Sequence, residues 1–255
     1  MKRIAVIGAG AMGGALVNGL LASGFDAACI ALSNPHKEKL EPFSARGVAT
    51  FTDNCEAVKG ASLVVLAVKP WLIAGVIEKL RGAIDPAAEV AAIVAGVSSA
   101  DLKAMWADKL PQALSIVMPN TAMALGQSMT FIVDVEGTAP LANEIFARTG
   151  SVMTIEECLL PAATALASCG IAYAMRYVRA SVEGGVELGF RAADAQRIVV
   201  APLRGAAALL DRPGTHAEAE IDKVTTPGGL TIRGLNAMEA AGFTPAVLAA
   251  LRASR

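Results

Sequence analysis

The chain has 255 residues, 54% of them hydrophobic, with a net charge of −1 and a mean hydropathy of +0.51. A balanced charge without a basic stripe argues against nucleic acid as a partner, and the notable apolarity is not gathered into the long charge-free run of a membrane span. Four separated cysteines and two histidines predict neither a disulfide framework nor a metal site, so we expect a cytoplasmic protein with reduced thiols.

The first 154 residues alternate short β-branched runs with helical patterns. Strands are predicted at residues 4–7, 29–32, 63–68, 90–94, 115–118, 129–133 and 151–155. Helices are predicted at residues 11–22, 37–46, 71–80, 99–106 and 138–149. This alternation predicts an α/β domain built on a Rossmann-type, doubly wound parallel sheet.

From residue 155 onward only helical spacing remains, at residues 162–188, 192–210, 230–241 and 245–253. We therefore predict two domains, residues 1–154 and an all-helical domain over residues 155–255. The helices are rich in alanine, and so small a domain cannot hide that much apolar surface. A homodimer formed through the C-terminal helices is expected, and a higher oligomer stays open.

A glycine-rich turn follows the first predicted strand. The strand at residues 4–7 runs into Gly8-Ala9-Gly10-Ala11-Met12-Gly13 and then into a helix. Gly8 permits the tight turn, Gly10 allows a pyrophosphate to approach the backbone, and Gly13 allows the helix to pack on the strand. The strand–turn–helix setting predicts a dinucleotide site.

The end of the second strand indicates which dinucleotide is bound. NAD sites usually carry an acidic residue there, and this chain has Ser33 and Asn34 instead. Both side chains can donate hydrogen bonds to a 2′-phosphate, and Lys37 can add positive charge. The sequence therefore favours NADP(H) over NAD(H).

Residues 222–234 place threonines around a Pro-Gly-Gly turn, directly before an apolar helix. Glycines let backbone N–H groups approach a ligand, and a helix N-terminus attracts carboxylates and phosphates. The segment predicts a receptor for an organic anion. The alternative is a threonine-capped helix that binds nothing.

Several motifs in the same order resemble the pyrroline-5-carboxylate reductase family over nearly the whole chain. They are Gly8–Gly13, Leu-Ala-Val-Lys-Pro at 66–70, Met-Pro-Asn-Thr at 118–121, Gly-Ile-Ala-Tyr at 170–173 and Val-Thr-Thr-Pro-Gly-Gly-Leu-Thr at 224–231. The resemblance implies an NADP(H)-binding N-terminal domain and a helical C-terminal domain that interlocks two subunits. It implies the reduction of 1-pyrroline-5-carboxylate, a small-molecule substrate, to L-proline.

The resemblance also assigns site residues. In addition to the glycine turn, Ser33 and Asn34, it implies a further set of nucleotide-binding residues: Asn54, Ala67, Val68, Lys69, Pro70 and Ala95. For the substrate carboxylate it implies Thr226, Gly228, Gly229, Leu230 and Thr231, with Glu157 close to the pyrroline ring. Hydride transfer to an imine needs mainly orientation, so Thr231, at the ring nitrogen, is the one catalytic candidate. Lys69 is interpreted as shaping the cofactor loop, with a catalytic lysine as the alternative.

The chain departs from the family pattern at several positions, and four of them bear on the substrate pocket or the nucleotide. Ala122 and Ile171 replace prolines, Cys169 replaces a serine, and Pro35 stands where an arginine commonly follows the asparagine. Two alternatives therefore stay open. One is an imine reductase or β-hydroxyacid dehydrogenase-like reductase acting on another substrate, and the other is a non-catalytic NADP(H)-binding regulator.

Overall fold

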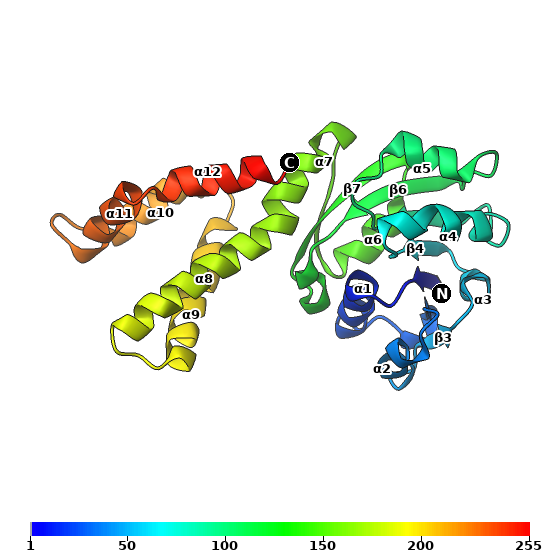
Figure 1. Ribbon diagram of the computed structural model, residues 1–255, viewed down its shortest axis with the longest axis horizontal. Helices are drawn as coiled ribbons and strands as arrows, with labels where there is room; N and C mark the ends of the chain where they lie inside the picture. The colour runs from blue at the N-terminus through cyan, green and yellow to red at the C-terminus, as the bar shows by residue number, and fades with distance from the viewer. Residues whose placement is uncertain (1) are drawn as a thin grey trace. The chain divides into compact units, whose positions relative to one another are not determined.

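The computed structural model describes residues 2–255, which form two compact units divided between Ser168 and Cys169 (Figure 1). This division falls later in the chain than the boundary predicted after residue 154. The reason is that residues beyond the last strand still pack on the sheet, where Ala163 is buried against Met118 and Phe131. The two units are described separately below.

The first unit is built on one eight-stranded sheet with the strand order β3-β2-β1-β4-β5-β6-β7-β8. The strands are β1 (Ile4–Ile7), β2 (Ile30–Ser33), β3 (Ala49–Phe51), β4 (Leu63–Leu66), β5 (Glu89–Ala92), β6 (Ala113–Met118), β7 (Ser128–Glu136) and β8 (Gly150–Thr154). The order reverses direction between β1 and β4, which is where open α/β sheets place their ligands. The Rossmann-type prediction is confirmed.

The helices of this unit cover both faces of the sheet. They are α1 (Ala11–Ala22), α2 (Glu41–Ser44), α3 (Asn54–Val58), α4 (Ile73–Leu80), α5 (Ser99–Trp106), α6 (Pro140–Ala147) and α7 (Leu160–Ala163). Successive side chains of a strand point to opposite faces, so Val6 packs in one core with Leu20 of α1 and Ile7 in the other with Ile77 of α4. Burial on both faces explains the nearly continuous apolar runs of the strands.

β7 departs from the predicted parallel arrangement. It pairs antiparallel with β6, and β8 then pairs parallel with β7. Only residues 119–127 connect β6 to β7, which is too short for the crossover that a parallel pair requires. The helix α6 supplies such a crossover between β7 and β8. These two strands are therefore parallel to each other and antiparallel to the rest of the sheet.

The second unit contains only helices: α8 (Gly170–Glu187), α9 (Ala192–Leu210), α10 (Ala217–Val224), α11 (Leu230–Ala240) and α12 (Phe243–Ala253). The helices α8 and α9 lie side by side, and a Cβ added to Gly185 would lie 2.9 Å from the Cβ of Ala195 (Figure 1). Within residues 169–255, all of them described, Val182 and Ala195 are the only buried apolar side chains. The unit therefore leaves most of its apolar surface uncovered.

The helix predicted at residues 162–188 is not uniform. Residues Thr164–Cys169 form a π-helix between α7 and α8. The whole run Glu157–Glu187 is 31 residues long and, by length and composition alone, apolar enough to cross a membrane, contrary to the expectation from sequence. A helix that packs against a second subunit has the same composition, and 11% of the apolar window is buried within the single chain.

Candidate nucleotide and substrate sites

The glycine turn between β1 and α1 leaves no room for side chains at two of its positions. Gly8 has a φ of 109°, and its N–H donates to the Ser33 carbonyl at 2.8 Å. A Cβ at Gly13 would lie 1.9 Å from the Gly8 carbonyl oxygen, whereas a Cβ at Gly10 would meet nothing within 4 Å. The turn is closed on the protein side and open at Gly10, where α1 begins without a side-chain cap. Such a helix N-terminus is suited to an anion.

A cavity of about 510 Å³ opens above this turn at the carboxyl ends of the strands. It brings together ten residues predicted to bind the nucleotide: Gly8, Gly10, Ala11, Met12, Ser33, Asn34, Asn54, Ala67, Val68 and Lys69. Three others, Gly13, Pro70 and Ala95, do not line it. Gly13 lies behind the turn, and Pro70 begins the 3₁₀ turn Pro70–Leu72.

The polar end of the cavity is formed by β2 and α3. The buried Ser33 hydroxyl donates to Asn54 Oδ1 at 2.7 Å, and Asn34 Oδ1 accepts the His36 N–H at 3.0 Å. Asp53 caps α3 by accepting from the Cys55 N–H at 2.7 Å, which fixes Asn54 at the first turn. No aspartate or glutamate of the described chain lines this cavity.

Sequence reasoning missed part of the lining. His36 and Lys39 come from the segment after β2, and Leu72, Gly75, Val76 and Lys79 come from the Pro70–Leu72 turn and α4. Lys37, to which the sequence assigned charge at the 2′-phosphate, lines a different cavity with Leu40 and Glu41. Lys37 and Lys39 stand at the two ends of the 3₁₀ turn Lys37–Lys39 and line different cavities. A segment this short has no periodic pattern from which the direction of each lysine could be predicted.

Lys69 lies at the cavity with its ammonium group 5.9 Å from the centre of the Trp71 ring. This cation–π distance and the following Pro70 hold the loop after β4 in one shape. In the preceding segment, the Ala67 N–H donates to the Ile7 carbonyl at 2.8 Å, which ties this loop to β1. The arrangement accords with a loop-shaping lysine.

Glu157 lies at the N-terminus of α5. Its Oε1 accepts the Ser99 N–H at 2.7 Å, across 58 residues of sequence. A carboxylate at that position satisfies a free N–H group and interacts favourably with the helix dipole. Glu157 therefore holds the loop that carries Ala95, and its position next to a pyrroline ring stays a prediction.

The Met118–Thr121 loop rests on a buried polar group that sequence reasoning did not identify. The Asn120 N–H donates to Ser128 Oγ at 3.2 Å, and Ser128 Oγ lies 3.1 Å from Thr130 Oγ1. Ser168 of the π-helix donates to the Pro119 carbonyl at 3.3 Å. Hydroxyl groups on β7 and on the π-helix thus fix the loop after β6.

In the second unit, residues 225–229 form the predicted turn before α11. The Gly229 N–H donates to the Thr226 carbonyl at 2.9 Å, and Gly228 has a φ of 71°. A Cβ at Gly229 would lie 2.4 Å from Thr226 Oγ1, so a larger residue there would require the Thr226 side chain to shift. No side chain caps α11, and Leu230 is 81% exposed. The first N–H groups of α11 are available to a ligand.

Tyr173, from the Gly-Ile-Ala-Tyr motif, has structural contacts. Tyr173 Oη hydrogen-bonds Ser254 and donates to the Ala250 carbonyl at 3.4 Å, which ties α8 to α12. Tyr173 is therefore a packing residue of the helical unit. Within residues 2–255, no group of three or more His, Cys, Asp or Glu side chains is placed to hold a metal ion.

The glycine turn and the cavity at the switch point define a Rossmann-type, dinucleotide-binding oxidoreductase. Residues 3–101 match the family model "NADP oxidoreductase coenzyme F420-dependent", and residues 157–255 match "Pyrroline-5-carboxylate reductase dimerisation". Pyrroline-5-carboxylate reductase 2 of Dictyostelium discoideum is 31% identical, with 97% of this chain and 89% of that one covered. The Corynebacterium melassecola enzyme is also 31% identical, with 99% and 96% covered. The chain belongs to the pyrroline-5-carboxylate reductase family.

Solved structures agree with this assignment. A pyrroline-5-carboxylate reductase from Coxiella burnetii matches with a TM-score of 0.90 and 27% identity, over 99% of this chain and 96% of that one. The Plasmodium falciparum pyrroline carboxylate reductase, solved with NADP bound, has the same fold at a TM-score of 0.88 and 22% identity, with 99% and 95% covered. Pyrroline-5-carboxylate reductase 1 of D. discoideum is 36% identical over 96% of this chain, which spans 47% of that protein's length.

Proposed function

We propose that this protein reduces 1-pyrroline-5-carboxylate to L-proline with NADPH, as an enzyme of proline biosynthesis in the cytoplasm. The observation that carries the proposal is the presence, in one chain of this family, of two separate anion receptors. One is the carboxylate-free cavity at the glycine turn, and the other is the uncapped start of α11 behind its Pro-Gly-Gly turn. An NADPH-dependent reductase of a cyclic imino acid requires both.

The first unit is proposed to bind NADP(H). The pyrophosphate would lie at the N-terminus of α1, beside Gly10, Ala11 and Met12, because Gly10 leaves open space there. Ser33, Asn34 and Asn54 would contact the adenosine ribose, and residues 67–70 with Ala95 would border the nicotinamide half. Gly8 and Gly13 shape the turn. When bound, the nicotinamide supplies the hydride.

The turn before α11 is proposed to hold the substrate. Backbone N–H groups of Gly228 and Leu230, beside Thr226, would bind the carboxylate, and Gly229, whose N–H donates to the Thr226 carbonyl, would shape the turn between them. Thr231 is exposed in the first turn of α11, and its hydroxyl has no hydrogen-bond partner within the described chain. It would hydrogen-bond the ring nitrogen and so orient the imine carbon for hydride transfer. The resemblance also implies Glu157 close to the pyrroline ring, and that assignment stays a prediction.

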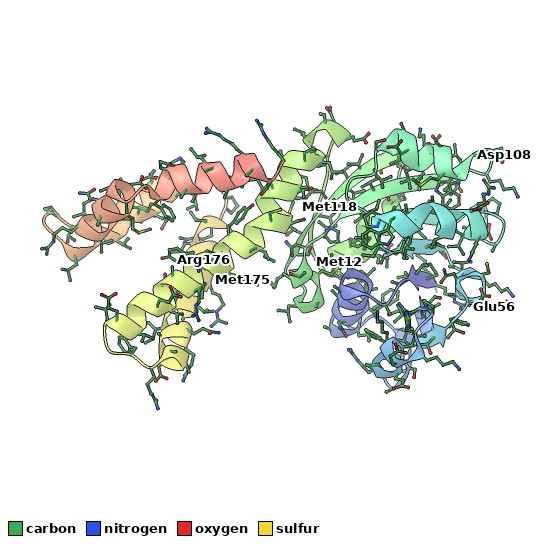
Figure 2. All side chains as sticks on the ribbon, viewed as in Figure 1. Met12, Glu56, Asp108, Met118, Met175 and Arg176 are labelled. Carbon is green, nitrogen blue, oxygen red and sulfur yellow. The ribbon has the colours of Figure 1, made fainter. Side chains whose placement is uncertain are left out.

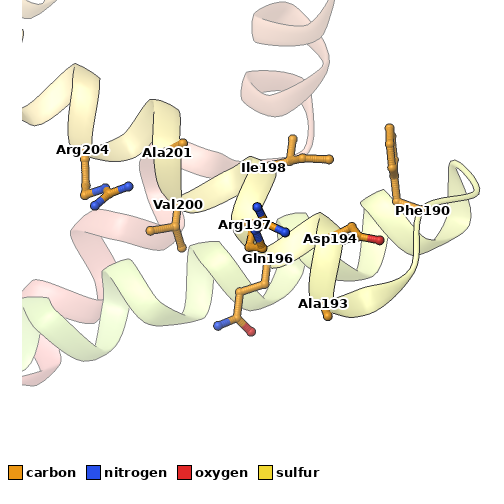
Figure 3. Close-up of a pocket in the computed structure, with 9 residues that line it drawn as sticks. All are labelled: Phe190, Ala193, Asp194, Gln196, Arg197, Ile198, Val200, Ala201 and Arg204. Atoms are coloured by element: carbon orange, nitrogen blue, oxygen red, sulfur yellow. The ribbon is translucent and has the colours of Figure 1, made fainter.

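The protein is proposed to work as a homodimer joined by its C-terminal helices. The family's dimerisation model matches this region, and the helical unit exposes large apolar side chains such as Met175, 63% exposed on α8 (Figure 2). A groove of about 970 Å³ also runs along α9 between Phe190 and Arg204 (Figure 3). A second subunit would cover these surfaces, and the mass of the assembly would also reveal any higher oligomer.

The departures at Ala122, Cys169 and Ile171 favour a second candidate, a reductase of this family acting on a different cyclic imine. Ala122 lies in the loop after β6, Cys169 ends the π-helix, and Ile171 is in the first turn of α8. Changes at these positions alter the shapes of the segments that carry the family's motifs. A non-catalytic NADP(H)-responsive regulator would keep the nucleotide cavity without turnover.

The test is a panel of cyclic imines assayed with purified protein against NADPH and NADH. We expect oxidation of NADPH with 1-pyrroline-5-carboxylate, and a stoichiometric yield of proline. Faster turnover of another imine would assign the second candidate. Absence of turnover with every imine, together with intact NADPH binding, would assign the regulator.

A further inference from the structure

The nucleotide cavity carries an excess of positive charge. Lys39, Lys69 and Lys79 line it together with His36, and no carboxylate of the described chain does so. The pyrophosphate of a dinucleotide carries one negative charge on each of its two phosphates, so it balances only part of the charge of Lys39, Lys69 and Lys79. The lining of the cavity therefore exceeds what an unphosphorylated dinucleotide requires.

Two of the lysines come from segments beside Ser33 and Asn54, since Lys39 follows β2 and the Lys79 carbonyl accepts from Cys55 Sγ at 3.6 Å. Lys39 ends the 3₁₀ turn that follows Asn34, and Lys79 lies in the last turn of α4. Both line the same cavity as Ser33 and Asn54, the hydrogen-bonded pair at the end of β2. The end of this strand is where a Rossmann site meets the ribose 2′ position. Lys69, in contrast, follows β4 and lies over Trp71.

Lys39 and Lys79 have no carboxylate partner within residues 2–255. Some other lysines are paired, since Lys59 bonds Glu56 at 2.6 Å and Lys103 bonds Glu136 at 2.7 Å, whereas Lys37, Lys69 and Lys109 share the unpaired state of Lys39 and Lys79 among the described residues. The hydrogen bond and the charge of Glu56 raise the pKa of Lys59, as expected for such a pair. No carboxylate of the described residues therefore competes with a ligand phosphate for Lys39 or Lys79.

We infer that Lys39 and Lys79 bind the 2′-phosphate and set the preference for NADPH. This inference rests on the proposed function, which supplies the dinucleotide. The position after Asn34, where the family commonly has an arginine, holds Pro35, which offers no charge. Two lysines from different elements replace that single guanidinium, and Ser33 and Asn54 supply neutral hydrogen bonds beside them. An ammonium is a point charge, which suffices for phosphate.

The test measures binding, so it does not depend on imine turnover. Calorimetric titrations with NADPH, NADH, 2′,5′-ADP and 5′-AMP compare the wild type with Lys39→Ala, Lys79→Ala and the double variant. Lys37→Ala is the matched control, because this neighbouring exposed lysine lines another cavity. We expect each single variant to raise the Kd for NADPH and 2′,5′-ADP about tenfold, since a hydrogen bond to a charged group is worth about 1.5–3 kcal/mol. The Kd for NADH and for 5′-AMP should change less than about twofold.

Equal losses for NADPH and NADH would place the lysines at the pyrophosphate and overturn the inference. It would also be overturned if either lysine variant matched Lys37→Ala, or if the wild type did not prefer NADPH to NADH. Selective, lysine-dependent binding of NADPH in a protein that reduces no imine would sustain this inference and reject the proposed function. Circular dichroism of each variant confirms that the compared proteins are folded.

Discussion

Gly13 and Gly10 are chemically identical, yet their surroundings give them different roles. A Cβ at Gly13 would penetrate the Gly8 carbonyl oxygen, whereas a Cβ at Gly10 would enter the open cavity. The first position limits how closely α1 packs on the sheet, and the second limits how closely a ligand approaches the backbone. The same substitution at the two positions separates folding from binding.

We expect Gly13→Ala to lower stability and Gly10→Ala to lower affinity. Overpacking against backbone costs about 1–3 kcal/mol or more, so Gly13→Ala should unfold at clearly lower temperature. Gly10→Ala should melt within about 2 °C of the wild type and bind NADPH at least about tenfold more weakly. Thermal melts and titrations measure both. A Gly10→Ala protein with normal NADPH affinity would remove the pyrophosphate from this turn.

Substitution of Thr231 tests the proposed substrate turn through a single side chain. Thr231→Val keeps the shape of the side chain and removes the hydroxyl, so kcat should fall about tenfold to a hundredfold, while the Kd for NADPH stays within about twofold. Thr231→Ser should recover much of the loss. Thr225→Val serves as a control, since the Thr225 hydroxyl donates to the Asp222 carbonyl at 3.1 Å. A collapse of NADPH affinity in Thr231→Val would show that the turn binds the nucleotide instead.

At the scale of elements, α5 depends on a residue far away in sequence. Glu157 accepts from the Ser99 N–H, and Ser98 caps the same helix by accepting from the Asp101 N–H at 3.1 Å. Together they satisfy two of the free N–H groups at the start of α5. The loop between β5 and α5, which contains Ala95, is therefore held at its α5 end.

Glu157→Ala should loosen this loop, with a loss of about 1 kcal/mol and faster hydrogen exchange at the Ser99 amide. Glu157→Gln, which keeps an acceptor, should retain most of the protection. Hydrogen exchange followed by mass spectrometry, compared with the KM for the imine, distinguishes a role of Glu157 in holding α5 from a role in binding the substrate. A raised KM without any change in exchange would place Glu157 at the substrate rather than at α5.

The elements that could be predicted from sequence are those with a local signal. The strand before Gly8 and the helix after Gly13 are marked by apolar runs and glycine spacing, and ten predicted nucleotide residues do line one cavity. The antiparallel direction of β7 did have a signal in the short connection between the strands predicted at 115–118 and 129–133, which the sequence reading did not use. The π-helix has no such signal, because a π-turn keeps helical periodicity. Lys79 reaches the cavity from α4, and Glu157 reaches Ser99 across 58 residues, so only the folded chain reveals them.

For the whole molecule, exposed apolar surface is the dominant feature of the helical unit. A buried core of two apolar side chains cannot stabilise residues 169–255 alone, since small domains bury too little surface. Stability of this unit should therefore depend on protein concentration, as it does when folding is linked to association.

Met175→Glu should convert the dimer to monomer, because it places a charge on the exposed apolar face of α8. Sedimentation velocity at several concentrations measures the shift, and Asp108→Lys, an exposed charge change after α5, should leave the mass unchanged. A wild-type monomer would contradict the dimer. Partition of the wild type into lipid vesicles would assign the apolar run Glu157–Glu187 to a membrane instead.

The nucleotide site combines two glycines that leave no room for a side chain with two lysines that lie on the surface. A Cβ added at Gly8 or at Gly13 would collide with the backbone carbonyl of Ala67 or of Gly8, while Lys39 and Lys79 project from exposed surface. Under the proposed role of Lys39 and Lys79, exchanging these two solvent-facing side chains would be enough to shift the coenzyme preference from NADPH toward NADH. The architecture that carries the reaction would stay intact through such a change.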